Sequence, residues 1–153
     1  MNTEQILDEL DKEILIELMK NSRLSYRKLA HKLQISTATL IERMKKLENS
    51  KIIKGYSANL DYSNIGYEYM GLVQLTIEQG NLLETQKKIS ALPGVVAVYD
   101  ITGPYDSIAI VMCKNRSQFS KLVKKILGIP KIKRTNTNVI LNVVKDQSEF
   151  IGL

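Results

Sequence analysis

Apolar residues recur with two different periods along this chain, and the change of period divides it into two parts. In the first part they are spaced by three or four residues, which is typical of one face of an α-helix. The first such face contains Leu7, Leu10, Ile14, Leu15 and Leu18. This helix is expected to end near Asn21.

Two further helices are predicted at short intervals after the first. Ser25 and Ser36 are residues that favour helix N-caps. The inner faces that follow contain Leu29, Ala30 and Leu33, then Leu40, Met44, Leu47 and the stem of Lys51. A short middle helix joined to the third by about three residues predicts a helix-turn-helix domain of the winged type. Gln34 lies in the turn, where a positive φ is often required and costs a residue other than glycine about 1 kcal/mol.

From Tyr67 the apolar residues alternate, which predicts β-strands. The expected strands cover residues 67–78, 95–102, 107–113 and 133–145. One helix is expected after Asn81, which forms a capping box with Glu84, and another after Asn115 or Ser117. The order β-α-β-β-α-β predicts a ferredoxin-like domain.

The predicted fold class is therefore α+β, with a helix-turn-helix domain at residues 1–54 and a ferredoxin-like domain at residues 67–153. Residues 55–66 are rich in Gly, Asn and Ser and form a linker or hinge strand in this interpretation. Both predicted helices of the second domain cover one face of its sheet. Yet the strands at 95–98 and 108–112 are apolar on both faces. A second copy of the same sheet would cover the open face, so we expect a homodimer.

Charge changes the picture of the first domain. The chain of 153 residues has a net charge of +6. Residues 1–19 sum to −5, residues 20–54 to +8 and residues 55–153 to +3. A dense basic segment that coincides with a helix-turn-helix favours binding to double-stranded DNA. A solvated lysine-rich helix face is the alternative explanation of this segment.

The third helix, with its core face fixed, presents small hydroxyl residues first and cations later. Its first turn is expected to reach base edges in the major groove, and its later cations to meet phosphates. Ile41 could contact a thymine methyl group or pack at the periphery of the domain. The residues expected to bind DNA are Ser25, Tyr26, Arg27, Ser36, Thr37, Ala38, Thr39, Ile41, Glu42, Arg43, Lys45 and Lys46.

Two sets of residues resemble one known family. In the first domain they include Leu29-Ala30, Ile35-Ser36, Arg43-Met44 and Ile53-Lys54-Gly55-Tyr56, and in the second Pro93-Gly94-Val95, Thr102-Gly103-Pro104-Tyr105-Asp106 and Thr135 to Leu141. The chain resembles the Lrp/AsnC, or feast/famine, family of transcription regulators over nearly its whole length.

The resemblance implies a DNA-binding regulator that dimerises through its C-terminal sheets and assembles further, to octamers. It also implies an amino-acid effector bound between dimers, which would alter how the dimers associate. The implied contacts are Gly103, Pro104, Tyr105, Asp106, Ser107, Thr135 and Thr137. From the residues alone, Gly103-Pro104 also reads as a simple hairpin turn that Asp106 caps.

Other classes of function find less support in the sequence. His31 and Cys113 are the one histidine and the one cysteine, and neither has a catalytic or metal-binding motif around it. We therefore expect no enzyme, no metal and no cofactor. The acidic N-terminus and the absence of a long apolar run favour a cytoplasmic protein without a membrane partner. A low-specificity architectural DNA-binding protein without an effector remains the alternative function, and RNA binding a weaker one, since the aromatic and basic strand pattern of RNA-binding sheets is absent.

Overall fold

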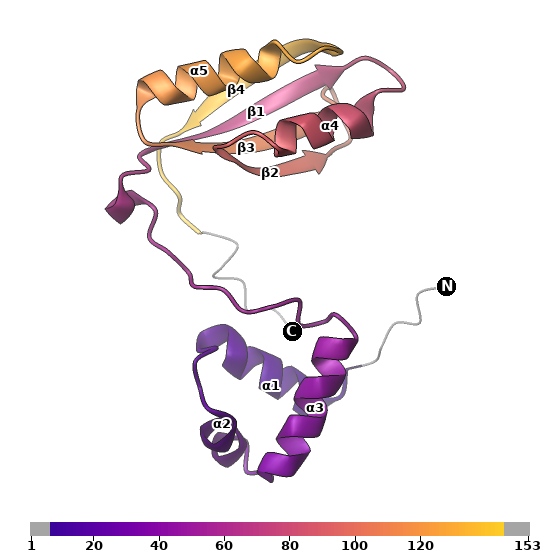
Figure 1. Ribbon diagram of the computed structural model, residues 1–153, viewed down its shortest axis with the longest axis vertical. Helices are drawn as coiled ribbons and strands as arrows, with labels where there is room; N and C mark the ends of the chain where they lie inside the picture. Colours follow the sequence, from indigo (N-terminus) through magenta and orange to yellow (C-terminus); the bar gives the residue numbers. More distant parts are fainter. Residues whose placement is uncertain (1–6, 146–153) are drawn as a thin grey trace. The chain divides into compact units, whose positions relative to one another are not determined.

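The computed structural model describes residues 7–145, which form two compact units. The first is built mainly from residues up to 59, and the second spans residues 60–144. Each unit is described by itself. Figure 1 shows helices alone in the first unit, and a sheet with two helices in the second.

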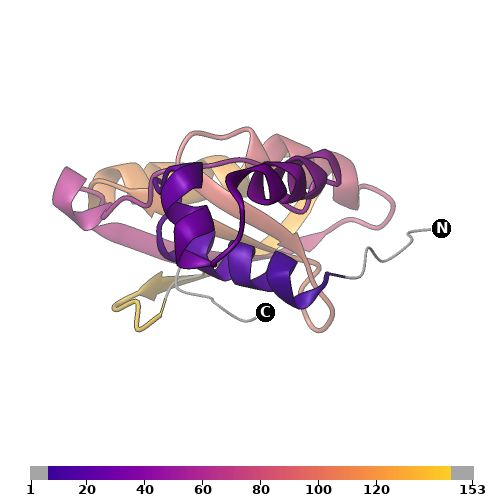
Figure 2. The same ribbon diagram turned by 90° about the horizontal axis from the view of Figure 1, so that it is seen from below.

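Three helices form the first unit: α1 (Glu9–Lys20), α2 (Tyr26–Lys32) and α3 (Thr37–Asn49). Each begins at the polar residue that caps it, which is Asp8, Ser25 or Ser36. Figure 2 shows the three helices gathered around a common centre. Their core contains Ile14, Leu15, Leu29, Ala30, Leu40, Met44 and Leu47. The predicted helical faces are therefore confirmed.

A residue with positive φ follows each of the helices α2 and α3. Gln34 has φ 55°, as expected for the helix-turn-helix turn, and Ile35 N–H donates to Ala30 O (3.0 Å). The inclusion of Lys51 in the core face of the third helix was wrong. That helix ends at Asn49, and Lys51 is exposed with φ 61°.

The segment between the units contains no strand from residue 50 to residue 68. Ile53 N–H donates to Leu47 O (3.0 Å), so the chain first turns back against α3. A short 3-10 helix, Ser63–Ile65, follows Asp61, whose carboxylate accepts from Ser63 N–H and Asn64 N–H. The predicted hinge strand does not form, because within residues 7–145 no strand lies beside this segment to pair with it.

The second unit has the predicted order β-α-β-β-α-β. Its elements are β1 (Tyr69–Ile77), α4 (Leu82–Ser90), β2 (Val95–Asp100), β3 (Ser107–Cys113), α5 (Arg116–Leu127) and β4 (Ile132–Ile140). The sheet is antiparallel with strand order β2-β3-β1-β4, and both helices lie on the same face (Figure 1). The predicted ferredoxin-like fold is confirmed.

Several details differ from the prediction. β1 and β2 are shorter than the predicted ranges 67–78 and 95–102, and the last strand ends at Ile140 rather than Lys145, where its pairing with β1 stops at Met70. Asn81 stands at the N-cap of α4, but its side chain makes no cap hydrogen bond and instead donates to Gln79 O (3.1 Å). The capping box with Glu84 is therefore not formed.

The alternation of β1 and β3 separates a buried face from an open one. Val73, Leu75, Ala109 and Val111 are wholly buried beneath the helices. The residues between them are only half-buried and face the side without helices: Met70, Leu72, Gln74, Ile108, Ile110 and Met112. The sheet therefore has an open face that is largely apolar at its centre, as the sequence predicted.

Candidate nucleic-acid interface and effector turn

The second and third helices of the first unit are held at their N-termini by serine side chains. Ser25 Oγ accepts from Lys28 N–H (3.3 Å), and Ser36 Oγ accepts from Thr39 N–H (3.0 Å). The Ser36 and Thr39 hydroxyls also lie 2.8 Å apart. These bonds fix the first turns of α2 and α3, where most of the residues predicted to bind DNA are located.

Exposure supports the predicted outer surface at these first turns. The exposed members of the set are Ser25, Tyr26, Arg27, Ser36, Thr37, Ala38, Glu42, Lys45 and Lys46, while Thr39, Ile41 and Arg43 are half-buried. Half-burial of Ile41 fits the peripheral packing that the sequence left open.

The later cations of α3 are not all available, because two of them already have carboxylate partners. Arg43 Nη1 donates to Asp8 Oδ2 and to Asp11 Oδ1 (3.1 Å), and Lys46 Nζ donates to Asp11 Oδ2 (3.3 Å). Asp11 is wholly buried, and each of its carboxylate oxygens accepts a hydrogen bond from a cation of α3. Sequence reasoning missed this cluster, since its members lie more than thirty residues apart and only the charges of α1 hinted at it.

The hydrogen bonds of this cluster also shift the pKa values of Asp8 and Arg43. The Asp11 N–H and then the Arg43 guanidinium hold the pKa of Asp8 below its ordinary value. Hydrogen bonds to Asp8 and Asp11 raise the pKa of Arg43. The acidic first helix therefore fixes the orientation of α3 through α3's own cations. In the described part of the chain, Arg27, Lys28 and Lys45 have no carboxylate partner and are left to meet an external anion.

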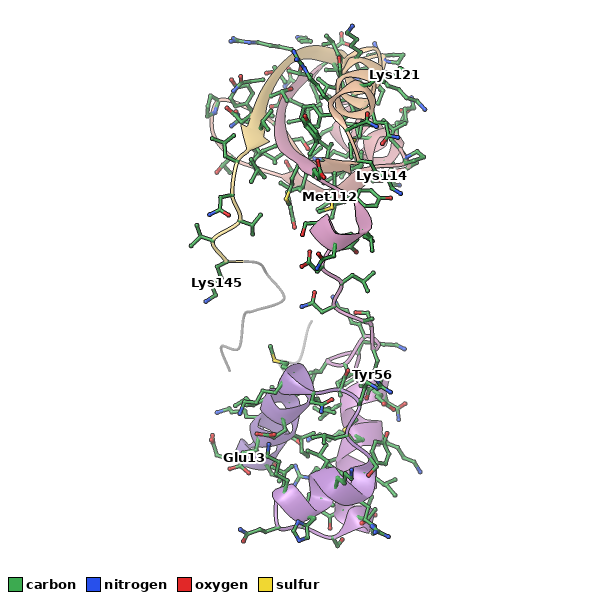
Figure 3. All side chains as sticks on the ribbon, turned by 90° about the vertical axis from the view of Figure 1, so that its left-hand side faces the viewer. Glu13, Tyr56, Met112, Lys114, Lys121 and Lys145 are labelled. Atoms are coloured by element: carbon green, nitrogen blue, oxygen red, sulfur yellow. The ribbon has the colours of Figure 1, made fainter. Side chains whose placement is uncertain are left out.

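The chain beyond α3 is tied back to that helix by Tyr56, which Figure 3 labels. Its hydroxyl donates to Glu48 Oε1 (2.9 Å). Burial, together with this bond, raises the pKa of Tyr56 to about 12. Tyr56 is therefore a neutral donor at any physiological pH, and it holds the start of the connecting segment against α3.

A shallow hollow of about 440 Å³ lies between α1 and α2. Its lining contains Glu13, Ile16, Glu17, Lys32, Leu33 and Gln34. Glu17 bonds to Lys32 and to Lys20 (3.1 Å), and these bonds lower the pKa of Glu17. Glu17 is thus paired with lysines, and Glu13 is the one carboxylate of this lining without an ion pair in the described chain.

The predicted effector turn joins β2 to β3, and Asp106 fastens it to β1. Asp106 Oδ2 accepts from Ile77 N–H (2.7 Å), and Asp106 N–H donates to Leu75 O (2.9 Å). Ile101 N–H closes the turn onto Asp106 O (3.2 Å). Gly103 has φ 116°, with open space where a side chain would stand. The geometry gives Asp106 the capping role that the residues alone favoured.

Ser107 does not belong to the accessible surface of this turn. It is wholly buried, its hydroxyl donates to Tyr99 O (2.7 Å), and it accepts from Gln86 Nε2 (3.2 Å). The prediction of Ser107 as an effector contact is corrected by the strand's alternation, which turns this side chain under α4 while Asp106 remains half-buried at the rim.

Thr135 and Thr137 lie on β4, the edge strand on the other side of β1. They pair with Leu75 and Val73 respectively, and paired residues of antiparallel strands share a face, so both threonines lie on the helix side of the sheet. Both are half-buried. The fold therefore brings the two predicted effector segments to either side of the C-terminal end of β1, with Leu75 bonded to one and paired with the other.

No group of three or more His, Cys, Asp or Glu residues within residues 7–145 is arranged to hold a metal ion. Cys113 is buried, which raises the pKa of its thiol, and His31 is exposed on α2. None of the helices in the same range is both long and apolar enough to cross a membrane.

Comparison with known proteins matches both units to named domains. Residues 7–48 match the AsnC-type helix-turn-helix domain, and residues 71–150 match the Lrp/AsnC ligand binding domain. An uncharacterized HTH-type transcriptional regulator of Pyrococcus abyssi is 42% identical over 141 residues, which cover 92% of this chain and 96% of that protein.

Solved structures agree over the whole fold. The structure of E. coli AsnC superposes with a TM-score of 0.86 at 27% identity, covering 93% of this chain and 97% of that chain. A transcriptional regulator of Neisseria meningitidis in complex with L-Met superposes with a TM-score of 0.86 at 22% identity, covering 92% and 94%. At that identity the second likeness shows the fold alone.

Proposed function

Because the chain belongs to the Lrp/AsnC family of transcription regulators, with a helix-turn-helix unit and a ligand-binding unit, we propose that it is a sequence-specific DNA-binding regulator responsive to an amino acid. The effector would change either the assembly of the protein or its affinity for DNA. The matched relatives are named as regulators and not as enzymes, so we assign the chain no catalytic activity. A DNA-binding role also places the protein in the cytoplasm in this proposal.

The observation that carries the DNA-binding proposal is the first turn of α3. Ser36 caps it, and Thr37 and Ala38 are exposed beyond the cap, as a helix that enters the major groove requires. We assign phosphate contacts to Arg27 and Lys45, which have no partner in the described chain. Arg43 and Lys46 position α3 through Asp11 and contact DNA only at its margin.

The test is a ratio of affinities at one fixed salt concentration. Genomic fragments retained by the purified protein supply its site, and binding to that site is compared with binding to a shuffled duplex. A specific regulator is expected to prefer its site by about 10³-fold or more. A ratio near one would support the alternative, a low-specificity architectural protein without an effector.

Two substitutions separate base reading from phosphate binding. Thr37→Ala is expected to reduce the preference for the site, whereas Lys45→Gln is expected to weaken binding to every duplex and to reduce the salt slope by about 0.9. Lys88→Gln is the matched control, because Lys88 is exposed in the other unit and paired with Glu84. Equal effects of all three substitutions would argue against α3 as the reading helix.

We place the effector at the turn of residues 103–106 and the adjoining part of β4. The match to a ligand-binding domain and the L-Met complex of a fold relative support an amino acid as the class of ligand. In this proposal Gly103, Pro104 and Tyr105 shape the open side of the turn. Asp106 faces the α-ammonium group of the ligand with the carboxylate oxygen that does not accept from Ile77 N–H. Thr135 and Thr137 complete the site from β4.

Calorimetry with each of the twenty amino acids tests this placement. Asp106→Asn keeps an oxygen for Ile77 N–H while removing the charge, so it is expected to abolish binding without unfolding the turn. Asp100→Asn, an exposed carboxylate at the end of β2, is the control. Binding that survives Asp106→Asn unchanged would remove Asp106 from the site.

Dimerisation through the open sheet face is the third part of the proposal. Leu72, Ile110 and Met112 are half-buried apolar residues with no helix above them, and a second copy of the sheet would remove them from water. Four such dimers would form the octamer that we propose as the larger assembly. Light scattering gives the mass of the assembly with and without the effector.

A further inference from the structure

The charge of the second unit is divided between two halves, and its mild net charge hides the division. Residues 55–106 contain two Lys or Arg and six Asp or Glu. Residues 107–145 contain nine Lys or Arg and no Asp or Glu. The half built from β3, α5 and β4 is therefore as basic as the helix-turn-helix segment.

The outer face of α5 gathers much of this charge. Phe119, Leu122 and Ile126 are buried against the sheet. At 100° per residue, Lys124 points most directly away from that buried face, with Lys121 about 60° to one side of it and Lys125 about 40° further round on the same side. All three lysines are exposed, and Lys121 lies on the side of α5 remote from the sheet in Figure 3.

Unlike Lys12 and Lys88 of two other helices, these lysines have no carboxylate on their own helix to pair with. Lys88 of α4 pairs with Glu84 (2.6 Å) and Lys12 of α1 with Glu9 (2.7 Å), both within one helical turn. On α5, in contrast, Lys121 is followed three and four residues later by further lysines, an arrangement that is repulsive in isolation. Among the described α-helices, only α2 and α5 lack acidic residues altogether, and α2 belongs to the proposed DNA-binding surface.

Ordinary structural roles explain only part of this set. Lys124 and Lys125 lie in the last turn of α5, where the helix dipole favours cations. Lys133 and Arg134 lie on β4, an edge strand, where charges discourage further strand pairing. Neither role applies to Lys121 in the middle of the helix, or to Arg116 in its first turn, where the dipole disfavours a cation.

We propose that the outer face of α5, formed by Lys121, Lys124 and Lys125, is a second DNA-contacting surface that binds phosphates without reading sequence. The inference rests on the proposed function, since a duplex held by the first unit is the polyanion that this chain would meet at close range. From residue 121 to residue 125 the helix rises about 6 Å, along which one DNA strand presents about two phosphates.

The experiment uses the full chain and two duplexes. The short duplex ends at the selected site, and the long duplex carries the same site with several further helical turns of unrelated sequence. Lys121→Gln/Lys125→Gln is compared with Lys87→Gln/Lys88→Gln, which removes the same charge from α4 on the same side of the same sheet. Glutamine forms helices about as readily as lysine, so both variants should fold.

On the long duplex we expect Lys121→Gln/Lys125→Gln to weaken binding about tenfold and to reduce the salt slope by about 2 per protomer, one lost phosphate contact for each lysine. On the short duplex this variant should match the wild type, and the α4 variant should match the wild type on both. Hydroxyl-radical protection beyond the site should shorten in the α5 variant alone.

Three results would overturn the inference. Equal binding of the α5 and α4 variants to the long duplex would leave the site-specific function intact and remove α5 from DNA. A loss of affinity by the α5 variant only for single-stranded RNA or for polyglutamate would assign the face to another polyanion. Failure of the wild type to bind either duplex would reject the proposed function together with this surface.

Discussion

The two units solve the problem of burying apolar surface in different ways. In the first, three helices enclose Ile14, Leu40 and Leu47 on all sides, and even the buried carboxylate of Asp11 finds both of its partners within the unit. In the second, α4 and α5 cover one face of the sheet and leave the other open. The first unit therefore buries its own apolar surface, whereas the second, in the proposal above, requires another surface to cover its open face.

The largest expected effect tests that requirement. Ile110 is on β3 at the centre of the open face, paired with Leu72 of β1. Ile110→Asp places a charge where the dimer would exclude water, and an unpaired buried charge is not tolerated. We expect sedimentation equilibrium at micromolar concentration to change from dimer or larger to monomer, with the fold of both units retained.

Leu83→Asp is the control for this substitution. Leu83 is 70% exposed on α4, on the face of the unit that already has its cover. It should leave the assembly unchanged. A wild type that sediments as a monomer would show that the open face is stable in water, and would contradict the expectation that the second unit needs a further surface to cover it.

The second prediction tests the self-sufficiency of the first unit. Asp11→Asn replaces a buried carboxylate that binds Arg43 and Lys46 by a neutral amide whose N–H₂ group faces a cation. Hydrogen bonds to charged groups contribute up to about 3 kcal/mol, so the first unit should lose about that much stability. Native-state hydrogen exchange should then accelerate about 100-fold in α1 and α3.

The exchange of β1 to β4 should not change, since Asp11 lies in the other unit. Glu13→Gln on the exposed side of the same helix provides the matched control, because it alters charge without a buried partner. Equal exchange in the Asp11 and Glu13 variants would mean that α3 is held by its apolar face alone.

The elements of both units could be predicted because local signals and the apolar period agreed. Ser25 and Ser36 mark helix starts that the structure reproduces, and Ser107 to Cys113 forms a strand with the predicted bounds. Where the period gave no information, the prediction failed. The last strand stops at Ile140, where its pairing with β1 ends, and the apolar pattern of residues 141–145 does not mark that limit.

The candidate sites were harder to predict, because contacts across the fold decide what each polar side chain does. On a helical projection Arg43 and Lys46 look like phosphate ligands, but in the structure both donate hydrogen bonds to Asp11 of α1. Ser107 adjoins the effector turn in sequence, yet alternation buries it beneath Gln86. Asp106 shapes its turn with one carboxylate oxygen, and only the proposal assigns the other oxygen to a ligand.

A third prediction concerns the covered face of the second unit. Gly71 of β1 lies against Phe119 of α5, and a Cβ added there would stand 2.5 Å from the ring. Gly71→Ala therefore overpacks the contact between helix and sheet and should destabilise the second unit by about 2 kcal/mol. Urea denaturation followed by amide exchange in β1 measures the loss.

The matched control is Gly128→Ala at the end of α5, where the added Cβ would be 3.4 Å from the nearest backbone atom and φ is already −76°. It should be close to neutral. A neutral Gly71→Ala would show that α5 can move on the sheet, and the covered face would then be less rigid than the first unit's core.

The smallest expected effect is the pH dependence of the first unit. The pKa of Asp8 is lowered from its ordinary 3.8, first by the Asp11 N–H and then by Arg43. A carboxylate whose pKa is lowered on folding contributes stability above its ordinary pKa and loses it as the pH falls through the folded value. The urea midpoint of the wild-type first unit should therefore decrease as the pH is lowered below about 4.

Asp8→Asn should flatten this decline slightly, whereas Glu42→Gln, which changes an exposed carboxylate of α3, should reproduce the wild-type curve. A decline that is identical in the wild type and the Asp8 variant would assign the acid sensitivity to other carboxylates, foremost Glu17, whose pKa its lysine partners also lower.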